Sequence, residues 1–259
     1  MSGDSGIAGK IALVTGAAGG IGTALVAALS AEGASIVAVD RSETGLAALA
    51  GRMRPTIQTR AVDLCDAAAV DALVESVERE IGPVEFGVSV AGILTTTTIV
   101  ETTNEAWGEA FAVNAGAVFA LGRALARGMI PRRRGSIVTV GSNAGAVPRQ
   151  GMAAYAASKA AASMFTRCLG LELARYGIRC NVVAPGSTRT PMLDALWASG
   201  GSEEASVGGS LETFRNGIPL GRIAEPDAIA DAIVFLLSDR ARHITMQELI
   251  VDGGASLVG

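Results

Sequence analysis

A tyrosine and a lysine share one face of an alanine-rich segment. In the stretch PRQGMAAYAASKAAAS (148–163), Tyr155 and Lys159 are four positions apart. Alanine is the best helix former and no proline follows Pro148, so we predict a helix that presents both side chains one turn apart. A phenol with a pKa of about 10 is a poor base at neutral pH, but a neighbouring cation favours its phenolate. The pair therefore predicts acid–base chemistry.

A glycine-rich turn predicts a phosphate-binding site near the start of the chain. The sequence VTGAAGGIG (14–22) follows an apolar run and precedes a helical segment. Glycines in such a turn let the backbone approach a pyrophosphate, and the helix N-terminus offers free N–H groups and a positive dipole end. Glycines also serve ordinary turns, so the motif gains its weight from its place between strand and helix.

Two acidic residues are candidates for binding the adenosine part of a dinucleotide. Asp40 ends an apolar run about 20 residues after the glycines, where a carboxylate accepts both ribose hydroxyls of NAD and repels a 2′-phosphate. We therefore favour NAD, although Arg41 is the residue type of an NADP site and otherwise flanks the adenine or points to water. Asp63 ends the next run, where it either meets the adenine amino group or caps a helix beginning near Asp66.

The elements that must position these residues alternate regularly along the chain. Strand-length apolar runs cover 11–16, 35–40, 56–63, 86–92, 135–142, 179–186 and 248–254. Helical segments cover about 19–32, 43–50, 67–81, 104–129, 151–176 and 226–237. Several runs are unbroken, as in parallel strands buried on both faces, so we predict an α/β, doubly wound parallel sheet of about seven strands with helices on both faces.

One segment breaks this alternation, and we call residues 189–225 the lid segment. It has a Gly/Ser-rich middle with scattered apolar residues beside the carboxyl end of an expected strand. Long irregular insertions at such a place are often binding lids, so we expect this one to cover a substrate site. The rest of residues 1–259 contains no second domain, repeat or low-complexity tail.

Composition narrows the class of protein. The chain has 259 residues, 49% hydrophobic content and a formal charge of −4 with acids and bases interspersed, which fits one domain and favours neither nucleic acid nor an anionic membrane. Its three cysteines, Cys65, Cys168 and Cys180, have no metal-ligand spacing, so we predict no metal site and free thiols in a reducing cytoplasm. No apolar run has the length of a signal or membrane span, and we expect a soluble cytoplasmic protein.

Together these motifs resemble the short-chain dehydrogenase/reductase family over essentially the whole chain. The resemblance rests on the glycine turn, on Ser142 at the end of GSIVTVGS, on Tyr155 and Lys159, on PGSTRT (185–190) and on VDGG (251–254). It implies a Rossmann-type fold in which Tyr155 takes an alcohol proton while hydride leaves for the nicotinamide. Lys159 would hold the nicotinamide ribose, Ser142 the substrate oxygen, and Asn114 a water of the proton relay.

The resemblance also implies where the cofactor lies and how the chains assemble. The implied NAD-binding residues are Gly16, Ala18, Gly19, Gly20, Ile21, Gly22, Asp40, Arg41, Asp63, Leu64, Ala91, Gly92, Tyr155, Lys159, Pro185, Gly186, Thr188 and Thr190. Ser89 replaces the asparagine that the family usually has after the fourth strand, from which we expect altered local stability and retained activity. A homotetramer is expected, built through segments 104–129 and 151–176 and the last strand and helix.

The C-terminal third contains FRNGIPLGRIAEPDAIADAIVFLLSD (214–239) and HITMQELIVDGG (243–254). Within the family, these stretches resemble the 2,3-dihydro-2,3-dihydroxybenzoate dehydrogenases of siderophore biosynthesis. In that subgroup NAD oxidises a cyclohexadiene diol carboxylate, and tautomerisation of the ketone gives an aromatic product. Such a carboxylate needs a cation, for which Arg149 at the rim and Arg189 in the lid segment compete. Met192, Leu196 and Trp197 would present an apolar face to the ring or pack against a neighbouring subunit.

Three alternatives stay open. A sister oxidation takes trans-2,3-dihydro-3-hydroxyanthranilate, whose amino group Gln150 or Ser187 would read. A 3-oxoacyl-carrier-protein reductase would prefer NADPH and expose a basic patch, against which Asp40 and the low basicity argue. A catalytically silent nucleotide-binding member is disfavoured by the intact serine, tyrosine and lysine. The single histidine, His243, is expected to be structural or interfacial.

Overall fold

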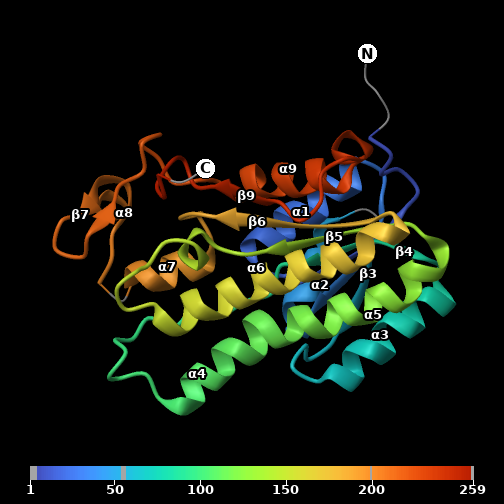
Figure 1. The fold of residues 1–259 in the computed structure, drawn as a ribbon, viewed down its shortest axis with the longest axis horizontal. Helices are drawn as coiled ribbons and strands as arrows, with labels where there is room; N and C mark the ends of the chain where they lie inside the picture. Colours follow the sequence, from blue (N-terminus) through green and yellow to red (C-terminus); the bar gives the residue numbers. More distant parts are fainter. Residues whose placement is uncertain (1–4, 54–56, 199, 258–259) are drawn as a thin grey trace.

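A computed structural model describes residues 5–53, 57–198 and 200–257, and within them seven parallel strands form one sheet (Figure 1). The spatial order is β3-β2-β1-β4-β5-β6-β9, which reverses direction at β1 as in a doubly wound fold. The predicted fold class is confirmed. The bounds are β1 (Ile11–Thr15), β2 (Ser35–Asp40), β3 (Ile57–Ala61), β4 (Val84–Ser89), β5 (Gly135–Val140), β6 (Ile178–Pro185) and β9 (Glu248–Val251).

The strand boundaries differ from the expected ones mainly at the carboxyl ends. The expected fourth strand, 86–92, begins and ends earlier, because the chain leaves the sheet after Ser89. The expected last strand, 248–254, ends at Val251 because Gly253 and Gly254 adopt left-handed φ angles of 64° and 89°. Position 56 of the expected third strand lies outside the described residues.

Helices cover both faces of the sheet, with one apolar core on each side (Figure 1). Successive side chains of a strand point to opposite faces, so Ala12 and Val14 of β1 lie in one core while Ile11 and Leu13 lie in the other. Every residue of β1 is buried, which explains its unbroken apolar sequence. The first core is covered by α1 (Gly20–Ala31), α2 (Glu43–Arg52) and α9 (Pro226–Leu237), and the second by α3 (Ala67–Glu80), α5 (Ala117–Arg132) and α6 (Ala153–Leu173).

The expected helix 104–129 is interrupted by a π-helical turn. It runs as α4 (Asn104–Phe111), the turn η1 (Ala112–Gly116) and then α5 to Arg132. Thr103 caps its start by accepting a hydrogen bond from the Ala106 N–H at 3.1 Å. By length and composition Asn104–Arg132 is apolar enough to cross a membrane, but over half of its apolar window is buried against this fold, as in a core helix.

The lid segment has more regular structure than its sequence predicts. It contains α7 (Pro191–Ala198), α8 (Glu203–Gly208) and a short hairpin of β7 (Gly209–Ser210) and β8 (Arg215–Asn216), at the carboxyl end of the sheet (Figure 1). Within the segment, Arg189 at its start forms ion pairs with Glu203 at 2.8 Å and with Glu225 at its end at 3.1 Å. The segment lies at the edge of the sheet where the parallel strands end (Figure 1).

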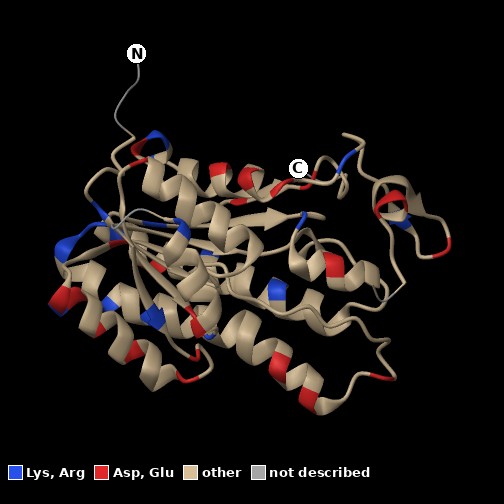
Figure 2. Cartoon of the chain, turned by 180° about the vertical axis from the view of Figure 1, so that it is seen from behind, with Lys and Arg blue, Asp and Glu red and all other residues tan. Residues whose placement is uncertain are grey.

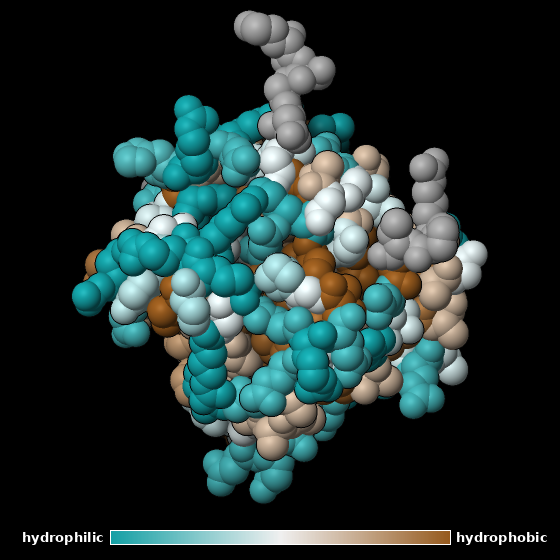
Figure 3. Space-filling view, turned by 90° about the vertical axis from the view of Figure 1, so that its right-hand side faces the viewer, coloured by the Kyte–Doolittle hydropathy of each residue, from teal (hydrophilic) through white to brown (hydrophobic). Residues whose placement is uncertain are grey.

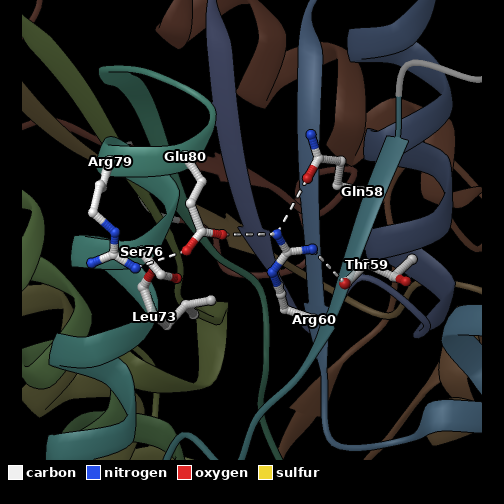
Figure 4. Close-up of polar contacts among 7 residues, drawn as sticks. All are labelled: Gln58, Thr59, Arg60, Leu73, Ser76, Arg79 and Glu80. Atoms are coloured by element: carbon white, nitrogen blue, oxygen red, sulfur yellow. Dashed lines mark hydrogen bonds and ion pairs between the residues drawn. The ribbon is translucent and has the colours of Figure 1, made fainter.

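The surface of the protein carries polar residues and charges of both signs, and a charged residue also occupies one edge of the sheet. Acidic and basic residues are interspersed along the helices visible in Figure 2. The end of the molecule opposite the lid segment is mostly hydrophilic, with apolar surface visible between polar side chains (Figure 3). At the edge strand β3, Arg60 donates to Gln58 and to the Thr59 carbonyl and faces Glu80 of α3 at 3.9 Å (Figure 4). A charged side chain on an edge strand discourages pairing with another chain.

Candidate active site

Two adjoining cavities open at the carboxyl ends of the strands. The first, which we call the glycine cavity, has a volume of about 280 Å³ and lies beside the glycine turn and Asp40. The second, the tyrosine cavity, has a volume of about 330 Å³ and lies between Tyr155 and the lid segment. The two share lining residues, which are Ile21, Val90, Gly92, Thr190 and Met192. A molecule of dinucleotide shape can therefore run from one cavity into the other.

The glycine turn has the geometry that a nucleotide needs. Gly16 adopts a left-handed φ of 65°, and a Cβ there would lie 2.6 Å from the Ala91 backbone nitrogen. A Cβ on Gly22 would lie 2.0 Å from the Gly16 carbonyl oxygen, so only glycine lets α1 begin this close to the turn. The Asp40 carboxylate accepts hydrogen bonds from the Ala18 N–H at 3.1 Å and the Ser42 N–H at 3.0 Å. The carboxylate is thereby held at the rim of the cavity.

The predicted cofactor residues divide between the two cavities. Ala18 lines neither, and its contribution is the N–H that orients Asp40. Only the tyrosine cavity is lined by Tyr155, Lys159, Pro185, Gly186 and Thr188. Only the glycine cavity is lined by Gly16, Gly19, Gly20, Gly22, Asp40, Arg41, Asp63, Leu64 and Ala91, whereas Ile21, Gly92 and Thr190 line both. Both cavities thus draw on segments that are far apart in the sequence.

The helix-cap alternative for Asp63 is wrong. Asp66 caps α3, accepting from the Ala68 and Ala69 N–H groups at 2.9 and 3.1 Å. The Asp63 carboxylate instead accepts from the Cys65 N–H at 2.9 Å and lines the glycine cavity. Cys65 lines the same cavity, a contact that the sequence did not suggest.

Ser142, Tyr155 and Lys159 meet at the wall of the tyrosine cavity. Ser142 follows β5, and its hydroxyl hydrogen-bonds the Tyr155 phenol and accepts from the Ala144 N–H at 3.2 Å. Lys159 lies one turn after Tyr155 in α6, with Nζ 6.0 Å from the phenol ring centroid. Its Nζ donates to the Val140 carbonyl oxygen at 2.9 Å. The structure therefore brings the expected serine, tyrosine and lysine into one constellation.

Burial sets the protonation of this constellation. Lys159 is 4% exposed, and burial lowers the pKa of its ammonium to about 8. Burial also raises the pKa of the Tyr155 phenol, and the hydrogen bond from Ser142 only partly opposes that rise. The expectation that the lysine cation favours the phenolate needs correction here, because desolvation is the dominant influence on both groups.

The Asn114 side chain lines neither cavity. It lies fully buried in η1, where its Oδ1 accepts from the Ile93 N–H at 2.9 Å and its Nδ2 donates to the Ile93 carbonyl and to Ser158 Oγ. Ser158 Oγ in turn donates to the Tyr155 carbonyl oxygen at 2.8 Å. Asn114 therefore joins the segment after β4 to α6, and its amide group is committed to those contacts.

Ser89, at the expected departure from the family, is buried at the end of β4. The backbone just beyond it is held by Thr15, whose Oγ1 accepts from the Val90 N–H at 3.3 Å. This contact ties the β4 exit to β1, beside the glycine turn.

The arginine candidates for a substrate carboxylate separate clearly. Arg149 lines the tyrosine cavity, together with Gln150. Arg189 lines neither cavity, because it is exposed and paired with Glu203 and Glu225. A second arginine that the sequence did not single out, Arg215 of β8, lines the cavity as well. Nothing local marked Arg215, because only the hairpin carries it to the cavity.

The apolar residues of α7 also divide. Met192 and Leu196 line the tyrosine cavity, as does Leu193 between them. Trp197 does not, since its Nε1 donates to Ser206 Oγ at 3.1 Å and its ring lies under the Arg189 guanidinium at 5.8 Å. In this structure Trp197 packs α7 against α8, and a contact between its ring and the substrate stays a prediction.

Comparison with known proteins agrees with this geometry. A family model described as enoyl-(acyl carrier protein) reductase matches residues 16–256. A Bacillus subtilis (strain 168) 2,3-dihydro-2,3-dihydroxybenzoate dehydrogenase is 51% identical over 97% of this chain and 98% of its own length. An Escherichia coli (strain K12) 3-oxoacyl-[acyl-carrier-protein] reductase is 36% identical over 96% and 98%. The crystal structure titled ribose-5-phosphate isomerase from Brucella melitensis 16M has a TM-score of 0.90 at 31% identity, covering 99% of this chain and 96% of that one. The chain belongs to the short-chain dehydrogenase/reductase family.

Proposed function

We propose that this protein is an NAD-dependent dehydrogenase that converts 2,3-dihydro-2,3-dihydroxybenzoate to 2,3-dihydroxybenzoate, a step of siderophore biosynthesis. The observation that carries the proposal is one cavity that holds a hydroxyl-binding pair, Ser142 and Tyr155, together with the guanidinium of Arg149. Such a cavity suits a secondary alcohol on a ring that also bears a carboxylate. The name of the relative from Bacillus subtilis supports the same substrate.

The glycine cavity supports a dinucleotide, and Asp40 favours NAD over NADP. At Gly16 and Gly22 a Cβ would collide with neighbouring backbone, so these glycines let α1 begin directly at the cavity with its N-terminal N–H groups available to a phosphate. The Asp40 carboxylate, fixed by two backbone N–H groups, is positioned to accept ribose hydroxyls and to repel a 2′-phosphate. Arg41 lines the same cavity and fits beside the adenine. When bound, the nicotinamide supplies the acceptor for the substrate hydride.

The residues of the tyrosine cavity divide the remaining work. Ser142 donates a hydrogen bond to the alcohol oxygen of the substrate. The Tyr155 phenolate accepts the proton of that hydroxyl as hydride leaves the carbon that bears it. Lys159, one turn away, holds the nicotinamide ribose. Its positive charge acts against the burial that raises the pKa of Tyr155 without outweighing it. Met192 and Leu196 pack against the ring and exclude water. The product ketone then loses a ring proton on tautomerisation, and the gain of aromaticity drives the oxidation forward.

The substrate assignment is tested by following NADH formation at 340 nm, roughly the absorption maximum of reduced nicotinamides, with two substrates side by side. We expect turnover of the dihydrodiol carboxylate with NAD and a much lower kcat/KM with NADP, because Asp40 opposes the extra phosphate. Faster turnover of trans-2,3-dihydro-3-hydroxyanthranilate would favour the sister reaction, in which Gln150 or Ser187 of the cavity wall reads the amino group. If the enzyme turns over neither compound, the substrate assignment is contradicted.

Replacing Tyr155 separates an enzyme from a silent nucleotide-binding protein. Tyr155→Phe removes only the phenol oxygen, so we expect kcat to fall by about 100-fold or more while NAD still binds. Unchanged activity would contradict a catalytic role for Tyr155. The carrier-protein reductase alternative has less support, because the formal net charge of the chain is −4 and Asp40 opposes the 2′-phosphate of NADPH. Basic and acidic residues both occur on the side of the molecule seen in Figure 2. A cytoplasmic location and a homotetramer are part of the proposal.

A further inference from the structure

The lid segment places a second guanidinium at the tyrosine cavity. Arg215 lies in β8, which pairs with β7 in the short hairpin, and it lines the cavity together with its neighbours Thr213 and Asn216. Its Nη2 donates to Ser187 Oγ at 3.0 Å, and Ser187 follows β6 at the cavity wall. This contact aims the side chain inward, across the cavity from the segment that precedes α6.

Arg149 and Arg215 both line the tyrosine cavity, and their environment differs from that of the ion-paired arginines of the chain. Within the described residues, neither has a carboxylate at ion-pair distance, whereas Arg132, Arg167 and Arg189 each do. Burial lowers the pKa of both guanidinium groups, and the positive charge of Arg149 lowers that of Arg215 further. The negative charge of Asp252 partly opposes the shift at Arg149, whereas no carboxylate opposes that at Arg215 among the described residues. Two half-buried cations that repel each other in one cavity are stabilised by an anion between them.

We propose that Arg149 and Arg215 together bind the carboxylate of the substrate, and that Arg215 determines the specificity of the enzyme for anionic rings. This inference deepens the proposed function and rests on it for the identity of the ring. The planar fork of a guanidinium matches a carboxylate through paired N–H···O hydrogen bonds. Two such groups grip both oxygens and fix the direction in which the ring enters.

The origin of the two arginines gives the pair a second consequence. Arg149 belongs to the segment leading into α6, the helix of Tyr155, whereas Arg215 belongs to the lid segment. A carboxylate held between them joins the lid segment to the catalytic helix. The ring hydroxyls are then presented to Ser142 and Tyr155 on the wall of the same cavity. A neutral alcohol makes no such bridge, so it is not oriented by the two arginines and does not join the lid segment to α6.

The test measures binding of benzoate and its neutral isostere benzamide by isothermal titration calorimetry, in the presence of NADH. We expect Arg215→Gln to weaken benzoate binding about 10- to 100-fold, because a charge-assisted bidentate contact is lost. Benzamide binding should stay within about 2-fold. Arg215→Lys should retain part of the benzoate affinity, since it keeps the charge but not the fork. The matched control is Arg222→Gln, an exposed residue of the lid segment outside the cavity lining, which should leave both affinities unchanged.

The outcomes separate this inference from the proposed function. Equal benzoate affinity in wild type and Arg215→Gln overturns the two-arginine site, as does an equal loss in Arg222→Gln. Arginine-dependent benzoate binding without turnover of the dihydrodiol leaves the carboxylate site standing and removes the substrate assignment. With the dihydrodiol itself, Arg215→Gln should raise KM more than it lowers kcat, and thermal unfolding of each variant shows whether the fold is retained.

Discussion

At the scale of single residues, Lys159 shows how the site works against the stability of the fold. It is one of two lysines in the chain, and its ammonium is nearly sealed from water beside Tyr155. The folded pKa of about 8 lies below the ordinary value of about 10.4, so the folded state holds this proton less tightly than the unfolded state does. The charge therefore destabilises the fold at pH 7, and the chemistry retains it.

Replacing Lys159 should stabilise the protein while inactivating it. Below pH 8 the lysine is charged in both states, so the full cost of burying the charge is present; between about pH 8 and 10.4 that cost disappears as the folded lysine loses its proton. We expect Lys159→Met to raise the free energy of unfolding by about 1–3 kcal/mol at pH 7, less at pH 10, and to lower kcat about 100-fold.

Urea unfolding at pH 7 and pH 10 measures this gain. The control is Lys10→Met, since the Lys10 ammonium lies over the Phe86 ring at 5.4 Å and outside both cavities. That variant should keep its activity and gain no stability at pH 7. A Lys159→Met protein less stable than wild type at pH 7 would show that the bond from Nζ to the Val140 carbonyl outweighs the cost of burial.

At the scale of elements, the turn between β1 and α1 depends on backbone conformation more than on side chains. Gly16 carries a left-handed φ, and Gly22 lies against the Gly16 carbonyl where the helix begins. On the other face of the sheet, the backbone conformation of the π-helical turn η1 likewise sets the position of a functional group. It directs the Asn114 amide at Ile93 and Ser158, and so connects the exit of β4 with α6.

A pair of glycine substitutions tests this dependence. A Cβ at Gly16 meets the Ala91 backbone in a left-handed conformation, so Gly16→Ala should cost about 2 kcal/mol or more of unfolding free energy and weaken NAD binding at least about 10-fold. A Cβ at Gly51 of α2 meets nothing within 4 Å, and Gly51→Ala should stabilise the helix by about 0.5–1 kcal/mol. Chemical denaturation and NAD titration measure both. Equal effects of the two changes would refute a conformational role for Gly16.

At the scale of the whole molecule, α5 and α6 form an outer layer with apolar side chains left exposed. Phe119, Met164 and Leu171 are 47%, 55% and 69% exposed, and the Phe119 ring meets Phe165 edge-on across the two helices. The same helices carry the small residues that permit close approach. On α9 and β9, Phe235 and Leu249 are also exposed, so the surfaces expected to join subunits are apolar.

A charge placed in this layer should dissociate the expected homotetramer. Met164→Glu would bury a carboxylate in an apolar interface, so we expect the mass measured by light scattering to fall from four chains to two or one. Leu211→Glu is the control, because Leu211 is 97% exposed at the lid segment, away from α5 and α6. It should leave the mass unchanged. A wild-type protein that is monomeric at micromolar concentration contradicts the prediction.

The fold class and the Tyr155–Lys159 pair were predictable from the sequence because their signals are local, whereas the reaction class followed from the resemblance to the short-chain dehydrogenase/reductase family. A helix repeats every 3.6 residues, so Tyr155 and Lys159 had to share a face, and unbroken apolar runs had to be buried strands. The glycine turn is likewise predictable locally, because glycine is the residue type that tolerates left-handed φ angles and close backbone approach. These features explain why the fold class and the core of the candidate site followed from the chain without coordinates.

Tertiary structure decided what depends on contacts between distant segments. Arg189 and Arg149 looked equivalent along the chain, but folding pairs Arg189 with Glu203 and Glu225 and leaves Arg149 facing the cavity. Folding also carries Arg215 to that cavity on a hairpin, and turns Trp197 toward Ser206. The direction of the pKa shifts depends on burial in the same way. A residue's type determines its chemistry, whereas its neighbours determine its charge partners and solvent, which only the folded chain supplies.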